Sequence, residues 1–175
     1  KIEVIKQLIQ QVDHLVIGGA MAYTFLKAKR YDVGLSLFEP DYVDFARELL
    51  DDAQQQGKEI VLPEDVVVTN SISDPTIIET VMIDSIASDV MGVDVGPQSL
   101  ATLKAILDQA KMVVWNGPLG VFEVDAFSKG TCECARYLAD SSAVTIVGGG
   151  DSVAAIEKVN LSDKMTHIST GGGAC

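Results

Sequence analysis

Long hydrophobic runs and paired cysteines are both absent from this sequence. The apolar segments are short, and none approaches the roughly 20 residues of a membrane-spanning helix. The first residues do not have the pattern of a signal peptide. Cys132, Cys134 and Cys175 form neither a CxxC pair nor a zinc-binding spacing. We therefore expect a reduced protein of the cytoplasm that does not bind a membrane.

Basic residues are scarce. The chain has 13 Lys and Arg against 25 Asp and Glu, which gives a formal net charge of −12. This charge argues against nucleic acid or an anionic membrane surface as a partner. A phosphorylated ligand would also be repelled by the general surface. Such a ligand needs local attraction from helix N-termini, backbone N–H groups, a few lysines and a metal ion.

Short apolar segments alternate with helical ones along the 175 residues. This length suits one domain with a substantial core. The alternation predicts an α/β fold, a Rossmann-like three-layer α/β/α domain with a mostly parallel six-stranded sheet. For residues 70–88 we expect strand and loop, with an edge hairpin. Strands are predicted at residues 14–17, 59–62, 66–69, 89–95, 112–115, 143–147 and 164–169, and helices at 1–11, 20–29, 41–56, 99–110, 126–139 and 151–159.

Glycine-rich turns follow five of the predicted strands. They lie at residues 18–19, 96–97, 116–120, 148–150 and 171–173. Glycine lets a phosphate approach the backbone where a Cβ would block it, and a helix N-terminus attracts an anion. Any single turn could need glycine for its dihedral angles alone. Five turns, expected at one edge of a parallel sheet, predict a cleft for a phosphorylated ligand.

Neither common nucleotide motif is complete. Gly148 and Gly150 begin a G-x-G-x-x-G pattern, but Val153 replaces its third glycine, which disfavours an NAD-binding dehydrogenase. The Walker A pattern is absent. Asp151 follows the glycines at the start of a predicted helix. Its carboxylate either caps that helix or binds Mg²⁺ between itself and phosphate oxygens, and the residues alone leave both interpretations open.

Residues 113–123 resemble the nucleotide-site signature of the phosphoglycerate kinases, and their sequence is VVWNGPLGVFE. Four further segments resemble motifs of that family in the family's order: residues 18–26, 91–97, 147–152 and 169–173. By this resemblance, residues 1–175 are the C-terminal nucleotide-binding domain of a two-domain kinase, truncated at both ends. A free-standing nucleotide-binding regulatory module is the alternative.

The resemblance implies a phosphotransferase with a carboxyl group as acceptor. The family moves a phosphoryl group between 1,3-bisphosphoglycerate and ADP in glycolysis, giving 3-phosphoglycerate and ATP with Mg²⁺. The N-terminal domain, which holds the acid substrate in the family, would be missing. We therefore expect this chain to bind Mg-ADP or Mg-ATP without turnover, and the full-length enzyme to be monomeric.

The resemblance also implies site residues. Asp151 would bind magnesium, and Lys1 with Gly171, Gly172 and Gly173 would contact the transferred phosphoryl group as catalytic residues. The residues expected to bind the nucleotide are Gly18, Gly19, Val93, Asn116, Pro118, Val121, Glu123, Gly149, Gly150, Asp151 and Ser152.

Other conspicuous side chains are interpreted as structural. Trp115 is expected to pack in the core rather than stack on a ligand. His14 and His167 flank predicted strands, and phosphoryl transfer needs no histidine base. Cys132 and Cys134 are expected to be half-buried and inert.

Overall fold

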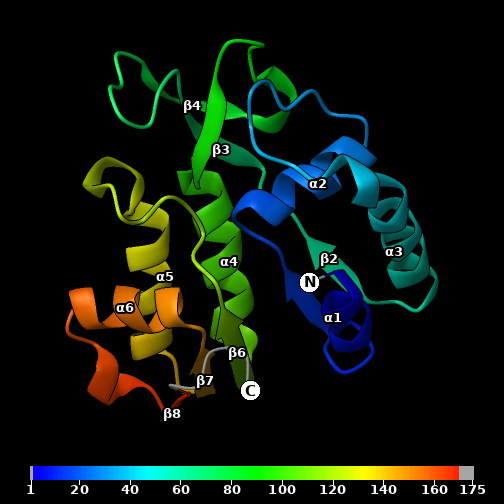
Figure 1. Ribbon diagram of the computed structural model, residues 1–175. Helices are drawn as coiled ribbons and strands as arrows, with labels where there is room; N and C mark the ends of the chain where they lie inside the picture. The colour runs from blue at the N-terminus through cyan, green and yellow to red at the C-terminus, as the bar shows by residue number, and fades with distance from the viewer. Residues whose placement is uncertain (1, 170–175) are drawn as a thin grey trace. The chain divides into compact units, whose positions relative to one another are not determined.

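The computed structural model describes residues 2–169 and divides the chain into two compact units, residues 1–96 and 97–175 (Figure 1). The units are called the first unit and the second unit below. None of the described helices is long and apolar enough to cross a membrane.

The first unit contains a two-stranded parallel sheet and three α-helices. Strands β1 (His14–Val16) and β2 (Glu59–Val61) pair so that His14 lies opposite Glu59. The His14 Nδ1 atom lies 2.9 Å from Glu59 Oε2, which supports the structural interpretation of this histidine. The helices are α1 (Ile2–Leu8), α2 (Ala20–Ala28) and α3 (Val43–Gln55), and the one-turn helix η1 (Pro40–Tyr42) precedes α3.

A three-stranded antiparallel sheet completes the first unit. Its strands are β3 (Asp65–Thr69), β4 (Ile78–Met82) and β5 (Met91–Val95), in the order β4-β3-β5, and the one-turn helix η2 (Ile83–Ser85) follows β4. The β3–β4 hairpin is closed by Asn70, whose Oδ1 accepts hydrogen bonds from the N–H groups of Thr76 and Ile77. The expected edge hairpin is therefore confirmed.

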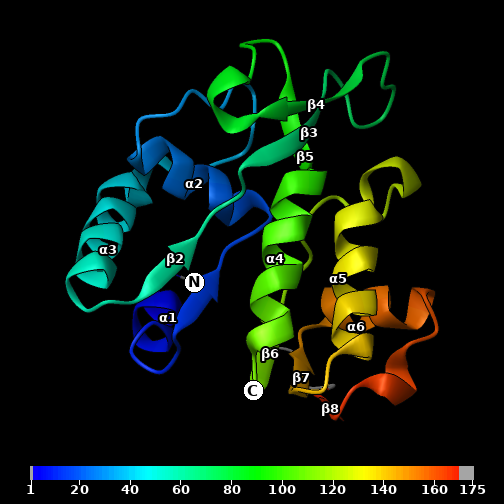
Figure 2. The ribbon, with the colours of Figure 1, turned by 180° about the vertical axis from the view of Figure 1, so that it is seen from behind.

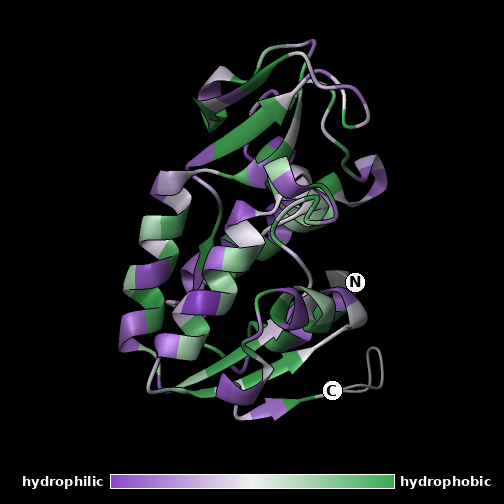
Figure 3. Ribbon diagram, turned by 90° about the vertical axis from the view of Figure 1, so that its left-hand side faces the viewer, coloured by the Kyte–Doolittle hydropathy of each residue, from purple (hydrophilic) through white to green (hydrophobic). Residues whose placement is uncertain are grey.

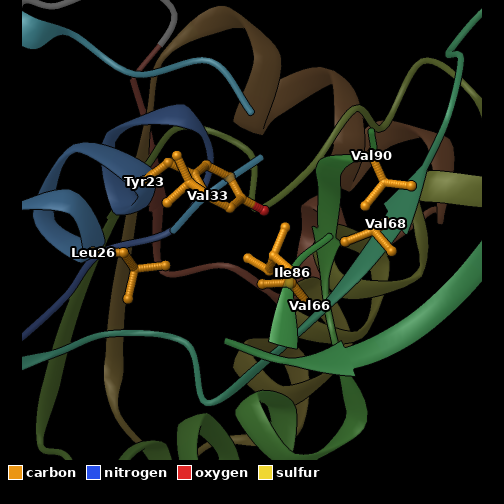
Figure 4. Close-up of a cluster of buried hydrophobic side chains, with 7 residues drawn as sticks. All are labelled: Tyr23, Leu26, Val33, Val66, Val68, Ile86 and Val90. Atoms are coloured by element: carbon orange, nitrogen blue, oxygen red, sulfur yellow. The ribbon is translucent and has the colours of Figure 1, made fainter. Parts of the chain in front are cut away.

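A cluster of buried side chains joins α2 to the antiparallel sheet (Figure 4). Tyr23 lies so close to Gly92 that a Cβ at Gly92 would overlap the tyrosine hydroxyl. Burial, with the nearby Asp94 as a smaller cause, raises the pKa of Tyr23 above its ordinary value. The members of the cluster are Tyr23, Leu26, Val33, Val66, Val68, Ile86 and Val90.

The second unit contains a three-stranded parallel sheet in the order β6-β7-β8 (Figure 2). Helix α5 packs against both α4 and α6. Among its described residues, two one-turn helices lie in the connections, η3 (Asp125–Phe127) and η4 (Ser162–Lys164). The strands are β6 (Met112–Asn116), β7 (Val144–Gly148) and β8 (His167–Ile168), and the helices are α4 (Pro97–Gln109), α5 (Lys129–Asp140) and α6 (Gly150–Lys158).

The faces of β6 differ in exposure. Trp115 is 7% exposed, which confirms that it packs in the core, whereas Met112 is 62% exposed and Val114 56%. Figure 3 shows mostly hydrophobic strands beside helices with alternating hydrophilic and hydrophobic bands. This banding is expected for helices that bury one face.

The prediction of one six-stranded, mostly parallel sheet is wrong. The described residues form a two-stranded parallel sheet, a three-stranded antiparallel sheet and a three-stranded parallel sheet. Parallel neighbours need a crossover of a dozen or more residues, usually a helix. Only eight residues, 70–77, separate β3 from β4, so these strands pair as an antiparallel hairpin. The α/β class and the alternation of strands with helices are confirmed.

Cys132 and Cys134 are more deeply buried than predicted, with exposed fractions of 8% and 5%. Burial raises the pKa of the Cys134 thiol from 9.0 to about 12. The reactive thiolate is therefore scarce in the folded chain at neutral pH.

We expect Cys134 to resist iodoacetamide at pH 8 in the folded chain and to react in urea. Peptide mass spectrometry measures both. Because its folded pKa is the higher one, this thiol contributes stability that is fully present below about pH 9 and is lost as the pH rises toward 12. Equal rates of Cys134 modification with and without urea would contradict the burial of this face of α5.

Candidate functional site

The carboxyl ends of β6 and β7 lie side by side in the second unit. In their parallel register Trp115 is opposite Val147, and Asn116 is opposite Gly148. The glycine-rich turns that follow the two strands therefore begin at the same level of the sheet. Open α/β sheets bind ligands at this edge.

The turn after β6 is held by its neighbours. Gly117 has φ +98°, a conformation that L side chains rarely adopt. The Trp115 indole Nε1–H donates a hydrogen bond of 2.7 Å to the Gly117 carbonyl. Two residues later, the Leu119 N–H donates to Thr131 Oγ1 at 3.0 Å. These bonds fix the path of the chain as it leaves the sheet.

The turn after β7 leads directly into α6. Gly149 has φ +87° at the N-cap position, and the Val153 N–H donates to its carbonyl at 3.1 Å. The N–H groups of Gly150, Asp151 and Ser152 precede this first helical bond. Among residues 2–169 we find no acceptor for them. They are the unpaired donors of the helix N-terminus, where an anion is favoured.

The two turns contact each other. The Gly117 N–H donates a hydrogen bond of 2.6 Å to Ser152 Oγ. A Cβ placed on Gly149 would lie 2.6 Å from Asn116 Oδ1, so the Asn116 side chain lies close to the Gly149 backbone. The structure thus brings together Asn116, Gly149, Gly150, Asp151 and Ser152 among the predicted nucleotide-binding residues.

Asp151 is exposed in the first turn of α6. Within the described chain its carboxylate makes no hydrogen bond or ion pair, so its contribution to α6 is that of a negative charge near the positive end of the helix dipole. No group of three His, Cys, Asp or Glu residues that could hold a metal occurs among residues 2–169. One carboxylate beside phosphate oxygens still suits Mg²⁺, which binds proteins through one or two carboxylates.

Pro118, Val121 and Glu123 lie on the loop after this turn. Pro118 and Val121 are partly buried, and Glu123 is exposed. The loop is braced by hydrogen bonds from Phe122 N–H to the Gly120 carbonyl and from Val124 N–H to the Val121 carbonyl.

The far end of α6 is attached to η3. Lys158 Nζ lies 2.8 Å from Asp125 Oδ1, and this contact lowers the pKa of Asp125. Both side chains are exposed, so the pair adds little stability by itself.

Gly18, Gly19 and Val93 belong to the first unit. The two glycines connect β1 to α2, and Gly19 has φ +66°. Val93 lies in β5 and is 3% exposed. Tyr23 on the following helix contacts Gly92, the neighbour of Val93, so this turn and this strand are joined through α2.

The five predicted turns do not follow the strands of one sheet. The turn at Gly96 follows a strand of the antiparallel sheet, because β5 pairs with β3. The turn at residues 171–173 lies outside the described residues, as does Lys1. The predicted roles of Lys1, Gly171, Gly172 and Gly173 therefore remain predictions.

Two structural partners of the site were not expected from the sequence. Thr131 is fully buried and accepts the Leu119 N–H, and the Ser152 hydroxyl accepts the Gly117 N–H. Both bonds join residues at least 12 positions apart. No local pattern indicates such pairs, because they depend on the packing of α5 and α6.

Adjacent strand–glycine–helix turns in a parallel sheet are typical of proteins that bind phosphorylated ligands. The family model described as phosphoglycerate kinase matches residues 1–175. The chain belongs to the phosphoglycerate kinase family. The members of this family are kinases of glycolysis, and they bind phosphoglycerate and a magnesium nucleotide.

Individual relatives agree. The chain is 52% identical to phosphoglycerate kinase of Synechococcus sp. (strain JA-3-3Ab), over 99% of this chain and 43% of that protein. It is 48% identical to phosphoglycerate kinase of Borrelia turicatae (strain 91E135), over 99% of this chain and 44% of that protein. The chain thus spans less than half the length of these relatives.

Solved structures match as well. Phosphoglycerate kinase from Coxiella burnetii superposes with a TM-score of 0.96 and 43% identity, over 99% of this chain and 45% of that one. Phosphoglycerate kinase from Pyrococcus horikoshii OT3 has a TM-score of 0.80 and 32% identity, over 99% of this chain and 43% of that one. The chain has the α/β fold of this family.

Gly149→Ala is expected to lower the free energy of unfolding by about 2 kcal/mol. The cause is the positive φ, together with crowding of Asn116 Oδ1 by the new methyl group. Urea unfolding followed by circular dichroism measures this change. Gly150→Ala is the matched control, because nothing lies within 4 Å of its Cβ position. An equal effect of the two substitutions would contradict the close approach of the two turns.

Proposed function

We propose that residues 1–175 are the C-terminal, nucleotide-binding half of a phosphoglycerate kinase and that they bind Mg-ADP or Mg-ATP. The observation that carries this proposal is the pair of adjoining turns after β6 and β7. Three backbone N–H groups that have no acceptor among residues 2–169, and one exposed carboxylate, meet at the second turn. This arrangement attracts phosphate and a divalent cation locally, on a chain whose net charge of −12 would otherwise repel the nucleotide.

The residues divide between phosphates and nucleoside in this proposal. The N–H groups of Gly150, Asp151 and Ser152 donate to phosphate oxygens at the start of α6. Asp151 holds the magnesium ion, which when bound would neutralise phosphate charge.

The nucleoside contacts come from other segments. Pro118 and Val121 contact the ribose and adenine side, and Glu123 accepts hydrogen bonds from the ribose hydroxyls. Asn116 contacts the phosphate or ribose region. Gly18, Gly19 and Val93 contact the adenine. Lys1 and Gly171–Gly173 would contact the transferred phosphoryl group.

In this proposal, the acid substrate binds to the remaining part of a longer enzyme. The chain spans 43% of the Synechococcus relative. The 12 excess negative charges also disfavour a site for a phosphorylated acid on the general surface. The full-length enzyme would be a monomer that transfers phosphoryl between 1,3-bisphosphoglycerate and ADP.

We expect the isolated chain to form no ATP from 1,3-bisphosphoglycerate and ADP, although it binds MgADP. A coupled assay at high chain concentration measures turnover, and calorimetry measures binding. Turnover by this chain alone would contradict the division of the substrates between two halves. Absence of any MgADP binding at millimolar nucleotide would contradict the nucleotide site itself.

Asp151→Asn tests the magnesium role. We expect MgADP affinity to fall by roughly tenfold, about 1.4 kcal/mol, because the ion loses its carboxylate ligand. Affinity for ADP without magnesium should stay the same or rise, because a carboxylate repels bare phosphates. Calorimetric titrations with and without Mg²⁺ separate the two effects.

The control variant is Glu157→Gln, which removes an exposed carboxylate farther along the same helix. We expect it to leave both affinities unchanged. If Asp151→Asn only lowers the thermal stability of the chain and leaves the magnesium dependence intact, Asp151 serves the helix dipole alone.

A further inference from the structure

Ser152 is an unusual polar residue within the candidate site. It lies in the first turn of α6, beside the exposed Asp151, yet its exposed fraction is 0%. A fully buried hydroxyl is costly unless it forms hydrogen bonds. Ser152 Oγ accepts the N–H of Gly117, which is 35 residues earlier in the chain and follows a different strand. The partner of this hydroxyl is thus another part of the protein.

Gly117 is held from both sides of its backbone. Its N–H donates to Ser152 Oγ at 2.6 Å, and its carbonyl accepts the indole N–H of Trp115 at 2.7 Å. Gly117 has φ +98°, but a glycine without a Cβ can adopt many other backbone conformations. The two hydrogen bonds select one of these conformations.

The contact joins the two turns at their closest approach. A Cβ added to Gly149 would lie 2.6 Å from Asn116 Oδ1. Gly149 is the N-cap residue of α6, so the placement of Asn116 relative to the free N–H groups depends on this packing. Among the described residues, the hydrogen bond from the Gly117 N–H to the Ser152 side chain connects these two turns.

We propose that Ser152 is a positioning residue: its hydroxyl ties the turn after β6 to the N-terminus of α6. Asn116 and the free N–H groups of α6 thereby form one preorganised edge for phosphate. The Ser152 hydroxyl faces the protein as an acceptor, and the backbone N–H of Ser152 remains available to the ligand. The hydrogen bond between the Gly117 N–H and Ser152 Oγ is observed in the structure. Its effect on nucleotide affinity rests on the proposed function.

The hydrogen bond between Ser152 and Gly117 affects ligand affinity because it orders the turn before the ligand binds. A turn that is ordered before binding does not lose conformational freedom when the phosphate arrives. Without the hydroxyl, the Gly117 N–H loses its acceptor and the glycine regains its freedom. Binding then has to order the turn, so affinity falls even though no direct ligand contact of a side chain has been removed.

The experiment compares Ser152→Ala with Ser152→Thr, which retains a hydroxyl. Hydrogen exchange of the Gly117 amide, followed by NMR without nucleotide, reports on the tie directly. Trp115 is the only tryptophan of the chain and bonds to Gly117, so its fluorescence reports on the same turn. Calorimetry with MgADP reports on the consequence for binding.

In Ser152→Ala we expect at least tenfold faster exchange of the Gly117 amide, a shift of Trp115 emission and roughly tenfold weaker MgADP binding. Ser152→Thr should restore all three. Ser128→Ala is the matched control, because the largely buried Ser128 hydroxyl donates to the Asp125 carbonyl at 2.8 Å and does not join the two turns. It should leave Gly117 exchange and MgADP affinity unchanged.

Unchanged Gly117 protection in Ser152→Ala would overturn the tie. Lost protection with unchanged affinity would overturn the positioning role. If the wild-type chain does not bind MgADP, the proposed function and the positioning role both fail, while faster Gly117 exchange would still support the tie. Should Ser152→Ala not fold, Ser152→Cys, whose sulfur is a weak acceptor, is measured at the same amide with the same expected direction.

Discussion

The register between β6 and β7 is the constraint on which the candidate site depends. It places Asn116 opposite Gly148, so two turns that are distant in sequence begin at the same level. A shift by one residue would exchange the two faces of a strand and expose Trp115. Burial of Trp115 and Val147 in the same sheet therefore supports the register. The hydrogen bond from the Gly117 N–H to Ser152 Oγ joins the turns that this register brings together.

The charges of the chain limit how the candidate site can attract a phosphate. The chain carries 12 excess negative charges, and the described residues contain no cluster of three metal-binding side chains. Backbone donors at the N-terminus of a helix attract a phosphate locally, because the helix geometry fixes their partial charges. In the proposed function, Asp151 would oppose a bare phosphate and favour a magnesium-bound one. A site of this kind would distinguish a metal nucleotide from a free one.

Much of the local structure was predictable because it follows from local patterns. The strand at 112–116 begins with four apolar residues, and the helix at 150–158 starts at the last of three consecutive glycines. The single parallel sheet was not predicted correctly. The pattern at residues 65–95 is compatible with either strand direction, and the short connection between β3 and β4 made those strands antiparallel. The assignment of the glycine turns to one sheet failed because β1 pairs with β2, and β5 with β3, in sheets separate from β6-β7-β8.

Family membership could be inferred from the sequence, since the motif at residues 113–123 and four further segments occur in a fixed order, and the family match over residues 1–175 confirms it. The glycines at these turns also indicated sharp turns from the sequence, and Gly117 and Gly149 do have positive φ angles that L side chains rarely adopt. The partner of the Ser152 hydroxyl was a different matter. A serine in the first turn of a helix can bond its own backbone, a ligand or a distant chain. Only the packing of α6 against the end of β6 selects the Gly117 amide, because that choice depends on distances between residues 35 positions apart.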